Sequence, residues 1–193
     1  MAPRQRRRPL PPRAASEPED TVKLEHAITT AIKYETRVHA VYREAAANAE
    51  HPVARRVFTT LSEEEKGHIT YLRQRLEEWR ENGSINLVEI DGQVGPRSAV
   101  EAGAARLRET LKGGSPGGTG AELESLRKAL QAERETSDFY RQMVATLDAD
   151  GKKLFERFVE IEEGHLAIVQ AEMDLVTGSG FWFDTADFSP EAG

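Results

Sequence analysis

The chain has 193 residues, a length that suits one domain with a sizeable buried core. It contains no cysteine, which excludes disulfides, zinc knuckles, iron–sulfur clusters and a four-thiolate iron site within this sequence. Hydrophobic residues make up 38% and charged residues 31%, as in a helical protein with charged outer faces, and no apolar run is long enough to cross a membrane.

Charge is unevenly distributed along the chain. Residues 1–20 contain five arginines against three acidic residues, a local charge of +2, and the net charge of −7 therefore leaves −9 for the remainder. We expect residues 1–20 to be a disordered, basic, Pro/Arg-rich arm. No apolar stretch follows its arginines, so it is a poor signal peptide, and a cytoplasmic location is expected. The acidic body argues against a nucleic-acid partner and favours cations.

Two long helices are predicted in the first half. The first is expected from Asp20 or Thr21 to about Ala49. The second is expected from about Pro52, which suits a first helical turn, to residue 82, where Gly83 can end it.

The second half is predicted to repeat this arrangement after a long connection. Residues 83–97 are expected to be irregular, 98–112 to form a short amphipathic helix, and the Gly-rich stretch 113–120 to form a loop. Thr119 and Glu122 fit a capping box that opens a third long helix ending near residue 147, and a fourth is expected over residues 151–177.

The connections between these helices predict the topology. Short turns join the first helix to the second and the third to the fourth, whereas some 36 residues (83–118) separate the two pairs. A long crossover in the middle favours a ferritin-like arrangement over a simple up-down-up-down bundle. We therefore predict an all-α, ferritin-like four-helix bundle over residues 21–177, followed by an aromatic tail over 178–193.

The second and fourth long helices carry the same short motif. Each has Glu-x-x-His with a glycine before the histidine, at residues 65–68 and again at 162–165. Residues three apart lie on one face of a helix, with Cβ atoms about 5–6 Å apart, so the carboxylate and imidazole can reach one metal ion.

The flanking helices repeat as well. Glu133 follows Glu35 by 98 residues, Tyr140 follows Tyr42 by 98, and the two Glu-x-x-His motifs are 97 apart. Matching positions in both halves indicate an internal repeat.

Six acidic and histidine residues are thus predicted to face the core and to form one site. Four carboxylates and two imidazoles in a bundle core are costly without a compensating charge, which two divalent cations would supply. Carboxylate and imidazole ligands suit iron or manganese. The six are Glu35, Glu65, His68, Glu133, Glu162 and His165.

Within this set, Glu65 and Glu162 can bridge two ions, and the arrangement leaves coordination positions open for O2 or peroxide. Two irons can together deliver the two electrons that cleavage of a peroxide O–O bond requires. The alternative is that these side chains lie on solvated helix faces. That alternative explains any single glutamate of the chain, but not six residues at core spacing.

These motifs resemble those of the ferritin-like superfamily, and most closely its rubrerythrin-type branch, over roughly residues 20–177. The resemblance implies that the six residues bind two iron ions, with manganese or mixed metals as alternatives. It implies reduction of hydrogen peroxide, oxidation of ferrous iron, or both, with peroxide or O2 as the substrate and a role in oxidative stress. It also implies a homodimer.

Two features depart from the rubrerythrin pattern. Rubrerythrins usually carry a second glutamate three residues after Glu133, where this chain has Thr136, and Glu135 is expected to point about 100° away from that position. No rubredoxin domain is expected after the last helix, so an external electron donor is expected.

Two tyrosines lie two turns after the lone glutamates, on the same helix faces. Tyr42 and Tyr140 are expected to hydrogen-bond ligand carboxylates or to donate electrons, and the alternative is a buried aromatic core with satisfied hydroxyls. His39 is expected near the site or at the surface. The repeated glycines, Gly67 and Gly164, suggest a close helix approach beside each histidine.

The aromatic tail, with GFWFD at 180–184 and Phe188, is expected to pack on the bundle or on a partner subunit. Two other functions are compatible with the sequence. One is an iron-binding or storage module with ferroxidase activity, which would require a hollow shell. The other is a metal-free helical interaction protein that uses the bundle and tail for docking.

Overall fold

The computed structural model describes residues 18–88, 90, 94–110 and 118–183. Five helices and no strand occur among these residues, which confirms the prediction of an all-α bundle with a long crossover. No helix in this part of the chain has the length and apolar character needed to cross a membrane. The helices are α1 (Pro18–Asn48), α2 (Pro52–Asn82), α3 (Arg97–Thr110), α4 (Gly120–Thr146) and α5 (Ala149–Ser179).

The first two helices follow the predicted turn signals. α1 begins at Pro18, two or three residues before the predicted start at Asp20 or Thr21. Residues 18–20 of the proposed basic arm are therefore helical, and residues 1–17 lie outside the described part of the chain. α2 has the predicted bounds, with His51 as its N-cap. Gly83 ends it in the left-handed conformation, with φ of 63°, and donates its N–H to the carbonyl of Trp79.

The capping box of α4 is confirmed. The Thr119 hydroxyl accepts the N–H of Glu122 at 3.2 Å, and the Glu122 carboxylate accepts the N–H of Thr119 at 3.0 Å. The other oxygen of Glu122 accepts the N–H of His51 at 2.9 Å, which ties the α1–α2 turn to the start of α4.

α5 is longer at both ends than predicted. Asp148 caps it from the side chain, accepting the N–H of Gly151 at 3.2 Å, so the helix begins at Ala149. It continues to Ser179, because Gly180 rather than Gly178 adopts the left-handed conformation that ends it.

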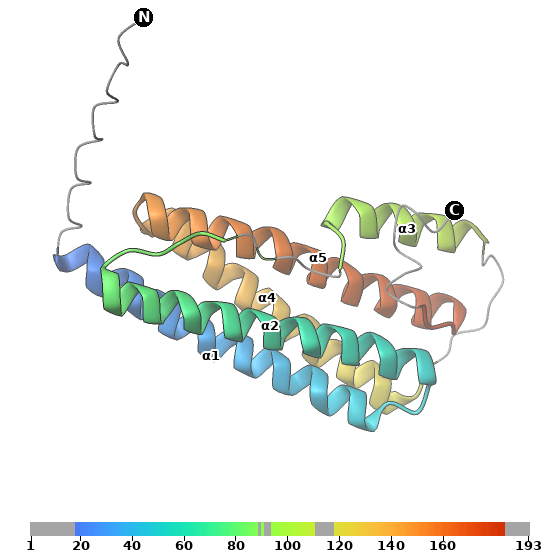
Figure 1. The fold of residues 1–193 in the computed structure, drawn as a ribbon. Coiled ribbons are helices and arrows are strands. Elements are labelled where there is room, and N and C mark those ends of the chain that lie inside the picture. The colour runs from blue at the N-terminus through green and yellow to red at the C-terminus, as the bar shows by residue number, and fades with distance from the viewer. Residues whose placement is uncertain (1–17, 89, 91–93, 111–117, 184–193) are drawn as a thin grey trace, which may run out of the picture.

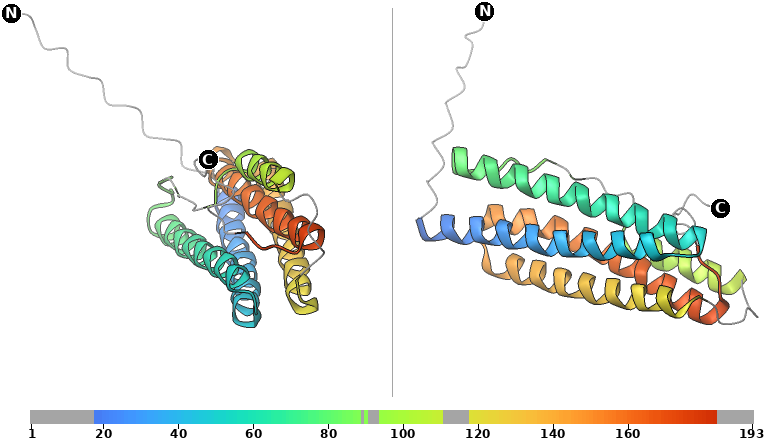
Figure 2. Two further views of the ribbon diagram at one scale, coloured as in Figure 1. Left: turned by 90° about the vertical axis from the view of Figure 1, so that its right-hand side faces the viewer. Right: turned by 90° about the horizontal axis from the view of Figure 1, so that it is seen from below.

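The four long helices form one bundle, with α3 on its outside (Figure 1). α1 packs against α2 and α4, and α5 packs against α4 and α3. α1 and α2 run antiparallel, as do α4 and α5, and the crossover carries the chain back along the bundle to the start of α4 (Figures 1 and 2).

Two apolar clusters fill the bundle, one toward each end. The cluster near the α1–α2 turn contains Tyr42, Phe58, Leu61, Leu126, Val176 and Trp182. The cluster at the opposite end contains Leu24, Ile28, Leu72, Trp79, Phe155 and Phe158. Any polar group between the two clusters is therefore shielded from water along the bundle axis.

The described part of the irregular crossover, residues 84–88, 90 and 94–96, is named the strap here. Side chains of α2 and α5 both hold its backbone. Arg75 of α2 donates to the carbonyl of Asn86 at 2.8 Å, and Arg157 of α5 donates to the carbonyl of Ile90 at 3.0 Å. The strap therefore lies along both helices.

The start of the aromatic tail packs on the bundle, as the sequence suggests. Trp182 is 6% exposed, and its ring lies edge-on to Phe58 with centroids 5.7 Å apart. Phe181 is 53% exposed. Residues 184–193, including Phe188, lie outside the described part of the chain.

Candidate metal centre

The structure brings all six predicted residues together between the two apolar clusters. α1 supplies Glu35 and α4 supplies Glu133, while α2 and α5 each supply a glutamate and a histidine one turn apart. None of the six is more than 2% exposed. The solvated-face alternative is therefore wrong for every member of the set.

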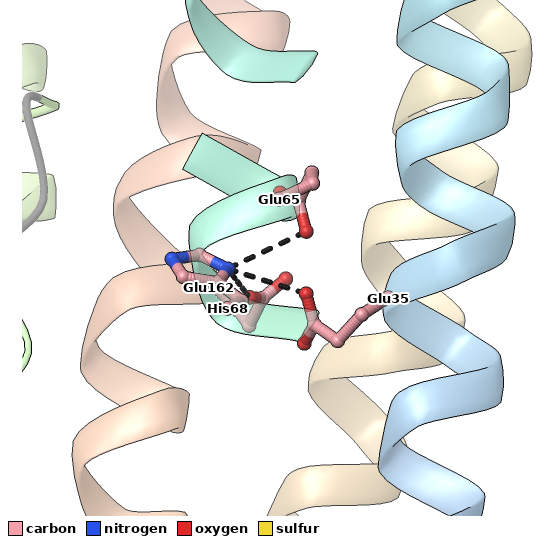
Figure 3. Close-up of side chains that lie close together, drawn as sticks. All are labelled: Glu35, Glu65, His68 and Glu162. Atoms are coloured by element: carbon pink, nitrogen blue, oxygen red, sulfur yellow. Dashed lines mark hydrogen bonds and ion pairs between the residues drawn. The ribbon is translucent and has the colours of Figure 1, made fainter. Parts of the chain in front are cut away.

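One half of the cluster is centred on His68. Its Nδ1 atom lies 3.2 Å from an oxygen of Glu35, 3.4 Å from one of Glu65 and 3.8 Å from one of Glu162 (Figure 3). These four residues each offer a ligand atom, and the four atoms lie within 4.8 Å of one another. Three carboxylates and one imidazole thus converge on one small volume.

The other half is centred on His165. Its Nδ1 atom lies 2.7 Å from an oxygen of Glu65 and 3.7 Å from one of Glu133. With Glu162 these residues form a second group whose ligand atoms lie within 4.8 Å of one another. Glu65 and Glu162 belong to both groups, and the rings of His68 and His165 stack with centroids 5.4 Å apart.

Many polar atoms in the cluster lie close to one another but have no partner with hydrogen-bond geometry among the described residues. They include both oxygens of Glu65, both oxygens of Glu162, Oε2 of Glu133 and Nδ1 of His165. Buried polar atoms are ordinarily paired, so this concentration needs an explanation. A pair of divalent cations would satisfy these atoms, and the donor set of carboxylates and imidazoles suits iron or manganese. The residues present therefore fit a dinuclear metal centre.

Burial and mutual repulsion raise the pKa of three of the carboxyls, which are Glu35, Glu133 and Glu162. For Glu35, burial first and then the charge of Glu65 raise the pKa to about 8. For Glu162, burial and the charges of Glu35 and Glu133 raise the pKa well above its usual value. Burial opposes ionisation of Glu65 too, but the neighbouring Glu35 carboxyl and the charges of both histidines outweigh it and lower its pKa.

The two histidines shift in the direction that favours their charged form. Burial lowers the pKa of His68, but the charge of Glu65 and the hydrogen bond to Glu35 outweigh it, so the pKa rises to about 10. Burial also lowers the pKa of His165, but the charge of Glu65, the hydrogen bond to Glu64 and the charge of Glu133 outweigh it and raise the pKa well above its usual value. Without metal, protons thus compensate the charge of the cluster, and bound metal would displace them.

The two tyrosines bond the carboxylates of the opposite half. Tyr42 of α1 donates to Glu133 of α4, and Tyr140 of α4 donates to Glu35 of α1. Burial, followed by the nearby carboxylate charges, raises the pKa of both phenols well above 10, so each remains a protonated donor. The predicted hydrogen bond from each tyrosine to a carboxylate of the cluster is therefore present.

Sequence reasoning missed Glu64, a buried carboxylate that contacts the cluster. Its Oε2 atom lies 2.6 Å from Nε2 of His165, and its Oε1 atom accepts the N–H of Val94 of the strap at 2.9 Å. The repeat contained a signal for it, because the residue 97 positions later is Ile161. Glu64 therefore occupies the repeat position of an apolar core residue. A buried glutamate at such a position is costly unless another buried group pairs with it.

On α4, Thr136 and Glu135 lie as expected from the departure of this sequence from the rubrerythrin pattern. Thr136 is buried and donates its hydroxyl to the carbonyl of Ala132 at 2.9 Å. Glu135 points outward, where it pairs with Arg37 at 2.6 Å and accepts a hydrogen bond from Gln131. Glu133 is therefore the one carboxylate that α4 contributes to the cluster among the described residues.

The expectation about the paired glycines is wrong. A Cβ at Gly164 would lie 2.8 Å from the carbonyl oxygen of Gly95, so the close neighbour is the strap and not a helix. At Gly67 no described atom lies within 4 Å of such a Cβ. His39 lies outside the cluster, with Nδ1 2.9 Å from the carbonyl oxygen of Ser62.

Comparison with known protein families agrees with the fold and the cluster. The sequence matches the Rubrerythrin family over residues 2–112, which contain Glu35, Glu65 and His68. No match was found among curated proteins or among solved structures. The family suggests an oxidoreductase, and the buried carboxylate and histidine cluster can hold metal. Because the match spans more than half of the sequence, the chain belongs to the rubrerythrin family and has its ferritin-like fold.

Proposed function

We propose that the protein is a non-haem diiron oxidoreductase that reduces hydrogen peroxide, oxidises ferrous iron, or does both. The observation that carries this proposal is the group of orphaned ligand atoms at the centre of the bundle. Glu65 and Glu162 would bridge two ions. Glu35 with His68 would hold one ion, and Glu133 with His165 the other.

When bound, two iron ions supply the two electrons that convert hydrogen peroxide and two protons into two water molecules, and an external donor restores those electrons. The chain supplies the surroundings. Its two apolar clusters exclude bulk water along the bundle axis. In that environment the fixed charges act more strongly than they would in water.

The tyrosines orient the terminal carboxylates. Tyr140 bonds Oε1 of Glu35, while Oε2 of the same carboxylate lies 3.2 Å from Nδ1 of His68. One oxygen is thereby fixed and the other is turned toward the histidine. Tyr42 holds Glu133 in the same way from the other half. Each phenol also keeps a proton at a carboxylate oxygen beside the proposed reaction site.

The burial of the site supports a small substrate. The six proposed ligands are at most 2% exposed, so a substrate must be small enough to reach them through the bundle. Hydrogen peroxide and O2 meet this requirement, and larger organic molecules do not.

Stopped-flow oxidation of anaerobic, iron-loaded protein tests the activity. We expect hydrogen peroxide to oxidise about two ferrous ions per molecule, as a two-electron reduction at a two-metal site requires. Glu162→Ala should slow this reaction strongly, whereas Glu135→Gln, at an exposed position on α4, should not. Oxidation no faster than that of free ferrous iron would contradict the proposal, and a faster reaction with O2 would favour the ferroxidase function.

Iron storage is a second candidate, because the same cluster would serve a ferroxidase that fills a mineral core. Storage requires a hollow assembly, whereas we propose a homodimer. The native mass of the iron-loaded protein separates these alternatives.

A further inference from the structure

Resting on the proposed metal centre, we propose that Glu64 is a positioning residue that makes the two metal positions unequal. The position held by Glu133 and His165 then binds a metal ion first and more tightly than the position held by Glu35 and His68.

The contact between Glu64 and His165 carries this inference. Nε2 of His165 lies 2.6 Å from Oε2 of Glu64, a carboxylate that is 6% exposed, while Nδ1 of the same ring faces Glu65 at 2.7 Å. An imidazole that binds metal through Nδ1 must carry its hydrogen on Nε2. A carboxylate at Nε2 fixes that tautomer, fixes the ring orientation and makes Nδ1 a better ligand.

Within the part of the chain that the structure describes, the other histidine has no equivalent contact. Nδ1 of His68 faces the carboxylates, but its Nε2 atom has no hydrogen-bond partner among the described residues. The ring of Phe158 packs edge-on to His68 with centroids 5.6 Å apart. At the repeat position of Glu64 the chain has Ile161, which is 8% exposed and cannot accept a hydrogen bond. On its Nε2 side, the ring of His68 is therefore held by packing among the described residues.

The strap fixes the Glu64 side chain in turn. Its Oε1 atom accepts the N–H of Val94 at 2.9 Å, so the two carboxylate oxygens have separate donors. The absence of a side chain at Gly164 lets the strap approach α5, because a Cβ there would lie 2.8 Å from the Gly95 carbonyl oxygen. Since the carboxylate is held from both sides, it is in place before metal arrives.

The difference in metal affinity between the two positions should be large enough to measure. Removing the carboxylate or carbonyl partner of a metal-binding histidine typically weakens metal binding by about 10–100-fold. The tighter position should retain its ion when metal is scarce, and the weaker position should exchange its ion.

Titration of the metal-free, full-length chain with Co(II) tests the proposal, with binding monitored by calorimetry and by visible absorption. We expect two resolved binding steps that differ by about 10-fold or more. Glu64→Gln keeps the side-chain size but has one oxygen for two donors, and should weaken the tight step by about 10-fold or more with little effect on the other. Glu63→Gln, at the exposed neighbour that pairs with Lys66, should leave both steps unchanged.

Three further variants assign the two binding steps to the two metal positions. His165→Ala should abolish the tight step, and His68→Ala should retain it, so the order remains testable even if Glu64→Gln does not fold. Ile161→Glu offers Nε2 of His68 a carboxylate, which no described residue provides, and should reduce the difference in affinity between the two steps.

Several results would overturn the inference while leaving the proposed metal centre intact. They are two steps of equal affinity in the unaltered chain, an equal effect of Glu64→Gln on both steps, or a tight step that survives His165→Ala. A Glu64→Gln protein of lower stability but unchanged Co(II) affinity would show that Glu64 serves only to anchor the strap. Absence of any Co(II) binding by the unaltered chain would overturn the metal centre itself.

Discussion

Tyr140 of α4 donates a hydrogen bond to Glu35 of α1, and this contact crosses between the two halves of the repeat. Tyr42 of α1 makes the reciprocal contact with Glu133 of α4. Each tyrosine therefore orients a carboxylate of the half to which it does not belong. The two halves therefore depend on each other in the metal-free protein.

Replacing Tyr140 with phenylalanine should destabilise the metal-free protein. The change removes the donor for a fully buried carboxyl, and leaving such a group unpaired costs about 1–3 kcal/mol. Urea denaturation of chelator-treated protein measures the free energy of unfolding. Tyr34→Phe, at a partly exposed ring that stacks on Phe139, is the matched control and should change it by less than about 0.5 kcal/mol. Equal stabilities of the two variants would contradict the role of this hydrogen bond.

The metal-free protein should lose stability as the pH rises. The pKa of Glu35 is raised from 4.5 to about 8 in the folded state, and that of His68 from 6.5 to about 10. Within these windows the folded state binds more protons than the unfolded chain, so the free energy of unfolding falls with increasing pH. The contribution of His68 is complete below 6.5 and is lost as the pH approaches about 10.

Thermal unfolding in chelator at about pH 6 and about pH 9 measures this dependence, and the midpoint should be lower at the higher pH. Glu35→Gln removes one of the two groups and should reduce the difference. Bound metal displaces the protons, so the loaded protein should lose this downward trend. A metal-free protein that is more stable at about pH 9 would show that the folded-state pKa values are not raised.

Adding a methyl group at the two motif glycines should have opposite effects. Gly164→Ala forces the Cβ against the Gly95 carbonyl and should cost about 1–3 kcal/mol, as overpacking does. Gly67→Ala meets no described atom within 4 Å and should stabilise the helix by about 0.5–1 kcal/mol. Equilibrium denaturation of both variants tests the pair, and a stabilising Gly164→Ala would show that the strap does not approach α5 this closely.

Trp182→Ala should lower the free energy of unfolding strongly, although this residue lies after the last helix. Its ring belongs to the apolar cluster around Phe58, and removing a buried tryptophan typically costs about 3–5 kcal/mol. Phe181→Ala, at the exposed neighbouring residue, should change the free energy of unfolding by less than about 0.5 kcal/mol. If both variants retained full stability in urea, the tail would not be part of the core.

The helices and the six-residue cluster were predictable because they rest on local spacing and on repetition. Glu65 and His68 are one turn apart, and a second copy of the pair follows 97 residues later. The Pro52 and Gly83 signals fixed the bounds of α2, and the capping box fixed the start of α4. These features depend on a few neighbouring residues and not on the tertiary fold.

The contacts of the strap were not predictable in the same way. Glu64 reaches His165 across 101 residues of sequence, and Val94 and Gly95 come from an irregular segment without a periodic pattern. Gly164 resembles Gly67 in sequence, but only Gly164 has a close described neighbour. Such contacts depend on where the crossover runs, which periodicity does not encode.

Metal content per chain tests the central claim most directly. Protein purified without chelators and then loaded anaerobically with Fe(II) should hold about two irons per chain, as a four-helix carboxylate site of this composition does. Glu133→Ala should hold clearly less, and Glu135→Ala, two residues away on the exposed side of α4, should still hold about two. Little or no iron in the unaltered chain after loading would contradict the proposed metal centre, and the buried carboxylates of α1, α2, α4 and α5 would then have no explanation.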